Sequence, residues 1–242
     1  MSTALPALPP ARSAQARGTA HRLAAAQSLL RQVEQHHGVT HHASTPPDDR
    51  YALAPPLHTL MGTHLAPGGV YVITGSATAL CAALIAPSQR GAIIAILGAP
   101  HLNMLAAHEI GVNTSALVLV TDPGDQAPTL AATCLDSAHI TVIGSHAALT
   151  ETDRRNLHAR ARERGHTILA TSPWPGAHTA LTLDNPTWQG PDIGRYHLNT
   201  ATWRATAHTR GPARRGALHT HNATLTMPPD LHEPRRHLTV VP

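Results

Sequence analysis

The chain contains no lysine and no phenylalanine. All 18 basic residues are therefore arginines, and aromatic residues make up only 2% of the 242 positions. Without lysine, the protein cannot use a lysine to neutralise nucleotide phosphates or to assist a catalytic tyrosine. The hydrophobic fraction of 42% still supports a sizeable core, which must be built from Ala, Val, Leu and Ile. The length predicts one α/β domain with appendages.

Cysteine is also scarce, since only Cys81 and Cys134 are present. Both lie in apolar runs without metal-ligand spacing, so we expect reduced, buried thiols and neither a disulfide nor a zinc site. Histidine is abundant, and isolated histidines therefore carry little weight. The clusters in question are His36, His37, His41 and His42, and the pair His219 and His221. No cysteine or carboxylate completes a metal site around them, so we expect no metal and no cofactor.

No export signal or membrane span is predicted. The N-terminal segment lacks a charged region followed by an apolar core, and the longest uncharged stretch, 51–89, is interrupted by proline and glycine. We therefore expect a soluble cytoplasmic protein without membrane contact. The net charge of +4 permits nucleic-acid binding but does not establish it.

Composition divides the chain into four parts. Residues 1–20 are rich in Ala, Pro, Ser and Arg, which favours disorder. Residues 21–56 are predicted to form an amphipathic helix followed by a linker, an N-terminal arm that docks separately or on a neighbouring molecule. The core is expected over 57–210. Residues 211–242 form an Arg- and Pro-rich tail that we expect to be partly flexible.

The core pattern predicts alternating strands and helices, the signature of a mainly parallel sheet flanked by helices. Strands are expected at 69–74, 92–97, 117–120, 139–143 and 167–170. Helices are expected at 101–110 and at 151–164, the latter with Thr150 as its cap, Asp153 completing a capping box and Gly165 as its stop. The alternating residues at 180–183 and 197–208 predict an antiparallel C-terminal extension of the sheet.

The stretch VYVITGSATALCAALIAP, 70–87, has the strand–turn–helix layout of a phosphate-binding loop. With Gly75 as the first glycine of G-x-x-x-x-G-K-[ST], the second glycine, the lysine and the hydroxyl are replaced by Leu80, Cys81 and Ala82. ATP hydrolysis is therefore not expected. Gly75, Ser76 and Thr78 remain a degenerate loop at which weak nucleotide binding is a lesser alternative.

Several stretches, in the same order along the chain, resemble the RecA recombinase core. They are the helix at 23–38, IGVN…AL at 110–117, TDPGDQA at 121–127 and VIGSHAAL at 142–149. This resemblance covers about residues 22–210 and implies a RecA-like P-loop NTPase fold, with an N-terminal helix that packs on an adjacent protomer. The departures fall on the ATPase positions. Gly144 stands in place of the Walker B aspartate, and Pro100 in place of the catalytic glutamate.

A RecA core altered in this way is similar to the actinobacterial mutagenesis accessory proteins of the ImuA-like (ImuA-prime, or SulA-like) family. WPGA at 174–177, Leu181-Thr182 and Trp188 match a segment typical of that family. The resemblance implies a non-catalytic, nucleoid-associated component of the DNA-damage-induced mutasome. Its partners there are ImuB, a Y-family polymerase-like scaffold, and an error-prone C-family replicative polymerase, and the C-terminal part is implicated in binding ImuB.

The C-terminal part of the core and the start of the tail also supply the candidate contact residues. They are Arg195, Arg204, Arg210, Arg214 and Arg215, with Trp188 and Trp203. The arginines suit phosphate neutralisation or a partner surface, but a solvated sheet edge is an equally good interpretation. Trp188 and Trp203 are more readily explained by packing than by base stacking. A DNA-binding module acting through this region is therefore the alternative function. Ser145 and Ser172 lack a nucleophile elbow and are not expected to be catalytic.

Overall fold

The computed structural model describes residues 48–189, 200–210 and 218–227. The segment at 1–20 and the helix expected within 21–56 lie outside the described residues, as does much of the tail at 211–242. Among the described helices, none is both long and apolar enough to cross a membrane.

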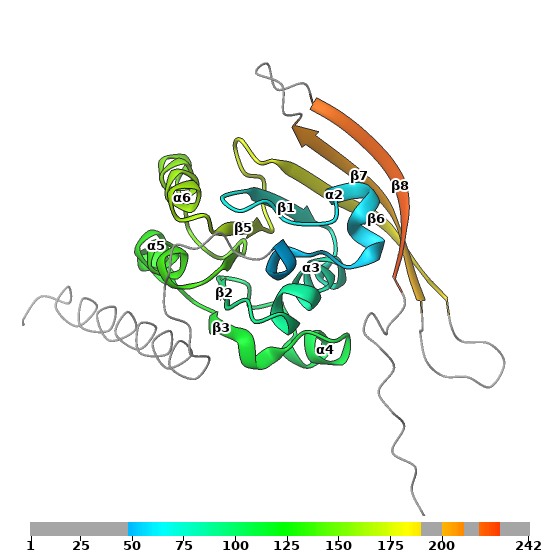
Figure 1. Ribbon diagram of the computed structural model, residues 1–242, viewed down its shortest axis with the longest axis horizontal. Helices are drawn as coiled ribbons and strands as arrows, with labels where there is room; N and C mark the ends of the chain where they lie inside the picture. The colour runs from blue at the N-terminus through cyan, green and yellow to red at the C-terminus, as the bar shows by residue number, and fades with distance from the viewer. Residues whose placement is uncertain (1–47, 190–199, 211–217, 228–242) are drawn as a thin grey trace, which may run out of the picture.

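The described strands form one eight-stranded sheet in the order β3-β2-β4-β5-β1-β6-β7-β8 (Figure 1). Their bounds are β1 Val70–Thr74, β2 Ile94–Leu97, β3 Leu117–Val120, β4 Ile140–Ile143, β5 Thr167–Ala170, β6 Thr179–Gln189, β7 Thr200–Arg210 and β8 Leu218–Met227. β1 to β6 pair in parallel, whereas β6, β7 and β8 pair antiparallel. This confirms the predicted fold class of a mainly parallel sheet, flanked by helices, with an antiparallel C-terminal extension.

Helices cover both faces of the parallel strands. The α-helices are α2 His58–Met61, α3 Ala77–Gln89, α4 Met104–Glu109, α5 Ala127–Ser137 and α6 Glu151–Arg164. Short 3-10 turns occupy η1 Asp48–Tyr51, η2 Pro55–Leu57, η3 Thr114–Ala116 and η4 Gly124–Gln126. Alternate residues of β1 enter opposite cores: Tyr71 and Ile73 pack with α2 and α3, and Val70 and Val72 pack with α5 and α6. Burial on both faces explains why these strands read as continuous apolar runs.

Helix α6 has the predicted bounds and the predicted ends. The Thr150 hydroxyl accepts a hydrogen bond from the Asp153 amide, while the Asp153 carboxylate accepts one from the Thr150 amide. Gly165 ends the helix in the left-handed conformation, at φ 69°. Helix α4 differs from the prediction, because Asn103 caps it and it begins only at Met104. Leu105 of this helix is 65% exposed.

Two segments depart from the expected division of the chain. Tyr51 and Leu53, in the predicted linker, are buried in the same core as α3, and a short backbone pairing joins this segment to residues 63–65. β8, which lies in the predicted flexible tail, is fully paired with β7. Its sequence, LHTHNATLTM, buries Leu225 on one face and exposes polar residues on the other, so the apolar signal is weak.

Candidate functional site

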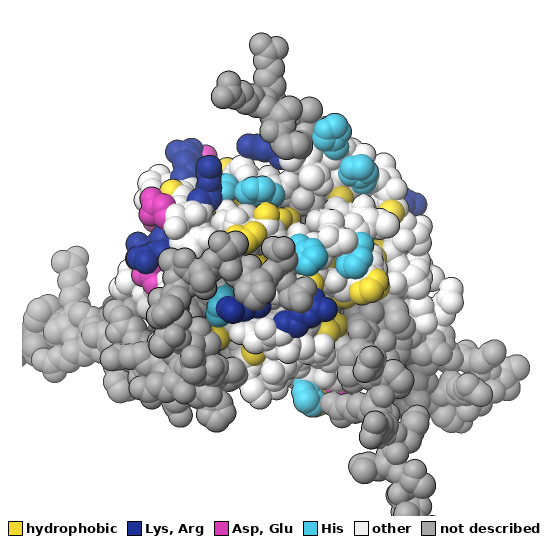
Figure 2. Space-filling view, in the orientation of Figure 1, with side chains coloured by type: hydrophobic (Ala, Val, Ile, Leu, Met, Phe, Trp, Pro, Cys, Tyr) yellow, Lys and Arg dark blue, Asp and Glu magenta, His cyan; other side chains and the backbone are white. Residues whose placement is uncertain are grey.

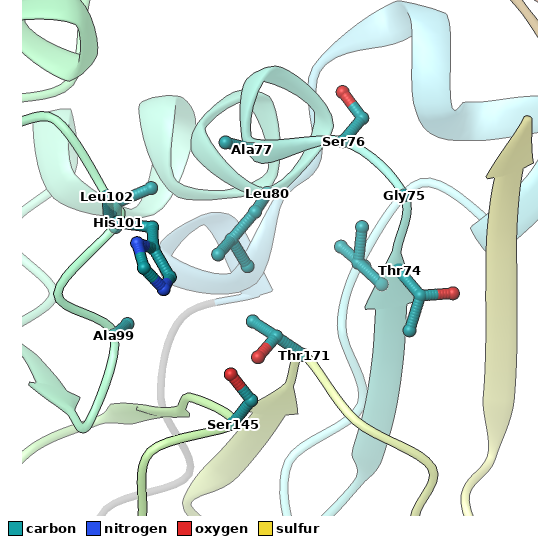
Figure 3. Close-up of a pocket in the computed structure, with 11 residues that line it drawn as sticks. Thr74, Gly75, Ser76, Ala77, Leu80, Ala99, His101, Leu102, Ser145 and Thr171 are labelled. Atoms are coloured by element: carbon teal, nitrogen blue, oxygen red, sulfur yellow. The ribbon is translucent and has the colours of Figure 1, made fainter. Parts of the chain in front are cut away.

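A pocket of about 190 Å³ lies at the carboxyl ends of β1, β2, β4 and β5, where ligands of open α/β sheets bind (Figure 3). It is lined by Ile73, Thr74, Gly75, Ser76, Ala77, Leu80, Ala99, His101, Leu102, Ser145 and Thr171. Leu80 points from α3 into the middle of the pocket, and Ser145 and Thr171 lie across from it. The described lining therefore offers hydroxyls, one imidazole and apolar surface, but no cation for a triphosphate.

The connection from β1 to α3 consists of only two residues, Gly75 and Ser76. The Ser76 hydroxyl caps α3 by accepting a hydrogen bond of 3.2 Å from the Ala79 amide. The helix thus begins at Ala77, inside the segment that would form a phosphate-binding loop. The Ala79 amide donates to the Ser76 hydroxyl and the Leu80 amide donates to the Ser76 carbonyl oxygen at 3.3 Å, so these two amides are not available to an anion.

The three replaced loop positions are buried inside α3. Leu80, Cys81 and Ala82 are 3%, 4% and 0% exposed and belong to the core shared with α2 and β7. An apolar environment explains these residue types, because a lysine there would have to bury its charge. Thr78 lies in the first turn of α3. Gly75, Ser76 and Thr78, the predicted degenerate loop residues, therefore sit at the helix start, and only the first two line the pocket.

Gly75 is required by the fold itself. Its φ is +87°, and a Cβ built on it would lie 1.9 Å from the Leu183 carbonyl oxygen of β6. A side chain at this position would be both strained and in collision with the backbone. Gly75, which suggested a phosphate-binding loop, is therefore needed because the backbone of β6 passes too close to it for any side chain.

Gly144, at the position expected for a Walker B aspartate, has no space for a side chain. A Cβ there would lie 2.2 Å from the Gly98 carbonyl oxygen. Two hydrogen bonds hold this approach, from the Gly144 amide to the Leu97 oxygen at 2.8 Å and from the His146 amide to the Gly98 oxygen at 3.0 Å. The ends of β2 and β4 are therefore held together without room for a carboxylate.

A histidine pair not identified from the sequence lies at the mouth of the pocket. The Nε2 atoms of His101 and His146 are 3.2 Å apart, and the rings meet edge to face. One ring therefore donates its Nε2 proton to the other. With 20 histidines in the chain, the sequence does not single out these two. They meet because the loop after β2 and the loop after β4 lie side by side.

The cysteines lie away from this pocket chemistry. Cys81 and Cys134 are free and buried, as predicted, and burial raises the pKa of the Cys81 thiol to about 11 and that of Cys134 to about 12. Within the described ranges, no group of three or more His, Cys, Asp or Glu side chains could hold a metal ion.

The predicted C-terminal contact residues are only partly brought together. Arg204 and Arg210 are exposed on β7, on the same face but six residues apart, which corresponds to about 20 Å along a strand. Asp184 of β6 stands directly opposite Arg204. Arg195, Arg214 and Arg215 lie outside the described residues.

The two candidate tryptophans have different environments. Trp203 is 3% exposed and packs into the core, whereas Trp188 is 49% exposed at the far end of β6. Their rings meet edge to face with centroids 6.0 Å apart. The preferred interpretation of Trp203 as a packing residue is confirmed, and Trp188 remains available for contact.

Sequence comparison finds one family profile and one relative that match part of the chain. The profile of the MT3502 N-terminal domain matches residues 58–176. The uncharacterized protein Rv3395c of Mycobacterium tuberculosis is 34% identical over 119 residues, which cover 48% of this chain and 58% of that protein. The chain thus matches little more than half the length of this relative.

Two solved structures show distant similarity. The RadB recombinase aligns with a TM-score of 0.45 at 14% identity, over 69% of this chain and 92% of that one. The flagellar accessory protein FlaH from Methanocaldococcus jannaschii aligns with a TM-score of 0.42 at 8% identity, over 69% of this chain and 96% of that one.

Proposed function

We propose that this protein is a non-catalytic RecA-like assembly component of the DNA-damage-induced mutasome, in the cytoplasm and associated with the nucleoid. In this role it bridges or regulates error-prone translesion polymerases, with an ImuB-like Y-family scaffold and a C-family replicative polymerase as partners. The partners follow from the resemblance of the sequence to ImuA-like proteins, and self-association through the N-terminal helix belongs to the same proposal.

The observation that carries the non-catalytic part is the start of α3. Because the helix begins two residues after β1 and buries Leu80, Cys81 and Ala82, the usual phosphate cradle and its lysine have no counterpart here. The backbone contact at Gly144 supports the same conclusion, since it leaves no space for a magnesium-positioning carboxylate.

A hydrolysis assay tests the absence of ATPase activity. The purified full chain should release no phosphate from ATP above background, with or without single-stranded DNA. His101→Ala serves as the matched variant, because His101 lines the pocket without entering either core. Turnover by the wild-type chain that this substitution abolishes would contradict the proposal.

Partner binding requires a separate experiment. A chain ending at Met227 keeps every described strand, whereas a chain ending before β7 would strip Trp203, Ala205 and Ala207 from the core. The full chain should co-purify with a Y-family polymerase-like protein from DNA-damaged cells. Retention by the shortened chain would assign the contact to residues before 228, and failure of the full chain to retain a translesion polymerase would refute the assignment.

DNA binding through the basic C-terminal region is the second candidate, favoured by the exposure of Arg204 and Arg210 on β7. Replacing Arg214 and Arg215 by Ala should lower the salt slope of single-stranded DNA binding by about 1.4, or by about 1.8 for duplex DNA, if both contact phosphates. Weak nucleotide binding at Gly75, Ser76 and Thr78 is a lesser alternative, which a calorimetric titration showing no heat with ATP would remove.

A further inference from the structure

A second group of nitrogen-bearing side chains lies near the amino ends of the parallel strands, whereas the pocket lies at their carboxyl ends. It consists of His158 and Arg162 from α6, His178 just before β6, and Arg210 at the end of β7, and is called here the amino-edge cluster. The His158 and His178 rings are 6.0 Å apart between centroids. Arg162 and Arg210 lie near enough to influence the charge of both histidines.

Backbone contacts fix His178 in place and determine which nitrogen carries its proton. The Val70 amide donates to His178 Nδ1 at 3.1 Å, so the neutral ring must hold its proton on Nε2. The His178 amide donates to the Val70 oxygen at 2.7 Å, and the Arg210 amide donates to the His178 oxygen at 2.8 Å. Neutral His178 therefore presents an Nε2–H donor from a rigid position between β1 and β7.

His158 contributes a nitrogen without a partner. Its Nε2 atom is buried and forms no hydrogen bond within the described part of the chain. Gly176 lies close to the same ring, because a Cβ built on Gly176 would be 3.7 Å from both Cε1 and Nδ1 of His158. A buried polar atom of this kind calls for a ligand or ordered solvent molecule to satisfy it.

Arg162 differs from the other arginines of α6. Arg154 donates to Ser172 and to the Pro173 oxygen, Arg155 pairs with Glu151, and Arg160 and Arg164 pair with Asp136. No described carboxylate pairs with Arg162 or Arg210. Figure 2 shows arginine side chains, interspersed with Asp and Glu, and histidine side chains over α6 and the adjoining end of the sheet. The cluster thus combines two available guanidinium groups with two imidazoles.

We propose that the amino-edge cluster binds a phosphate group, either free phosphate or one on a polynucleotide backbone. Two guanidinium groups offer charged, forked donors that match phosphate oxygens, and the His178 Nε2–H and His158 add donors on a second side. No described carboxylate pairs with either guanidinium group, although Glu163 lies beside Arg162 on α6. This site is separate from the pocket beside α3, and it shares Arg210 with the candidate C-terminal contact residues.

Protonation is coupled to this binding. Burial is the main cause that lowers the pKa of both histidines. The positive charges of Arg162 and Arg210 lower both pKa values further, and His178 also lowers the pKa of His158. Tyr71 of β1, whose ring stacks 6.0 Å from His178, is the other titratable group facing them, and burial raises its pKa. A bound anion offsets the cationic repulsion around His158 and favours its imidazolium form, whereas the Val70 amide at Nδ1 keeps His178 neutral. The phosphodiester of an oligonucleotide should therefore bind more tightly as the pH falls from about 8 to about 6.

The test uses the full chain, with inorganic phosphate and a short single-stranded oligonucleotide titrated separately. Arg162→Gln and Arg210→Gln should each weaken binding by about tenfold or more, the loss expected for a charge-assisted hydrogen bond. The matched control is Arg155→Gln on the same helix, which should leave phosphate affinity within about twofold of the wild type. All three side chains are at the surface, so folding should be retained.

The two titrations distinguish the source of the phosphate. Binding of inorganic phosphate alone identifies a small-molecule site, and oligonucleotide binding with the same dependence on Arg162 and Arg210 identifies a polynucleotide site. Histidine ring proton signals followed by NMR in the wild-type chain give a second measurement, in which the anion should raise the pKa of His158. Absence of binding in both titrations, or an equal loss in the control, would overturn the proposal.

Discussion

A Cβ on Gly144 would lie 2.2 Å from the carbonyl oxygen of Gly98, so the ends of β2 and β4 meet through their backbones. Gly144 occupies the position where the resemblance to RecA expects the Walker B aspartate, and this contact explains why no side chain fits there. Gly144→Asp should consequently give a destabilised chain without magnesium-dependent nucleotide binding.

Gly144→Ala isolates the steric part of this effect. The substitution should lower the free energy of unfolding by about 2–3 kcal/mol, because the added methyl group overpacks a site closed by backbone atoms. Urea denaturation measures the change. The neighbouring Ser145→Ala is the control, and it should shift stability by less than about 0.5 kcal/mol because Ser145 is exposed. Equal stability of the Gly144→Ala and Ser145→Ala chains would contradict the contact.

Gly75→Ala should be more damaging than Gly91→Ala, although both glycines have nearly the same positive φ, 87° and 82°. A methyl group on Gly91 would meet no atom within 4 Å, so its substitution should cost only about 1–2 kcal/mol of left-handed backbone strain. Gly75→Ala adds a collision with Leu183 and should cost at least about 2 kcal/mol more. The difference between the two midpoints of urea unfolding measures this collision.

Trp203→Ala should destabilise the chain more than Trp188→Ala, because Trp203 is buried in the core and Trp188 is half exposed. Removing Trp203, which is 3% exposed, should lower the free energy of unfolding by about 3–5 kcal/mol. Removing Trp188, which is half exposed, should cost about 0.5–1.5 kcal/mol, largely through its edge-to-face contact with Trp203. Thermal and urea unfolding of the two variants test this order, and a reversed order would show that β6 and β7 pack differently.

The ion pair between α5 and α6 should make stability depend on acidity. The hydrogen bonds from Arg160 hold the pKa of Asp136 below its usual range, against the opposing effect of partial burial. The resulting stabilisation is present above the unfolded-state pKa of about 3.9 and is lost as the pH falls through the lower folded-state pKa. Because the pair is partly exposed, its contribution should be below about 1 kcal/mol.

Asp136→Asn tests that contribution by urea unfolding at neutral and at acidic pH. The variant should be less stable than the wild type at neutral pH, and the difference should shrink as acid protonates Asp136 in the wild-type chain. Glu151→Gln removes a carboxylate from the more exposed pair with Arg155 and should change stability less. A loss in Asp136→Asn that stays constant down to acidic pH would exclude the electrostatic origin.

Both thiols should resist modification in the folded chain. With pKa values of about 11 for Cys81 and about 12 for Cys134, neither forms appreciable thiolate near neutral pH, and both are buried. Titration with a chromogenic disulfide reagent should detect no thiol until denaturant is added, after which both should react. Rapid reaction of either one in the native state would show that its core opens readily.

The sequence alone was sufficient where the signals are local. Helix α6 was predicted from end to end because Thr150, Asp153 and Gly165 act within one turn of its ends. The strands at Leu117–Val120 and Thr167–Ala170 were predicted at their observed bounds from short runs of strand-forming residues. All four residues of Thr167–Ala170 are buried, whereas Leu117–Val120 is the partly buried edge strand. The sequence also shows directly that the chain contains no lysine and that Cys81 and Gly144 occupy the positions where the resemblance to RecA expects a lysine and an aspartate.

Tertiary structure decided what depends on distant partners. β8 is a strand because β7 pairs with it, and residues 51–53 belong to the core because α3 packs on them, although neither segment has a strong local pattern. From the sequence, Gly75 resembled the first glycine of a phosphate-binding loop, and Gly144 stood in place of a Walker B aspartate. Their need for glycine comes from Leu183 and Gly98, whose carbonyl oxygens approach them only once the sheet is assembled.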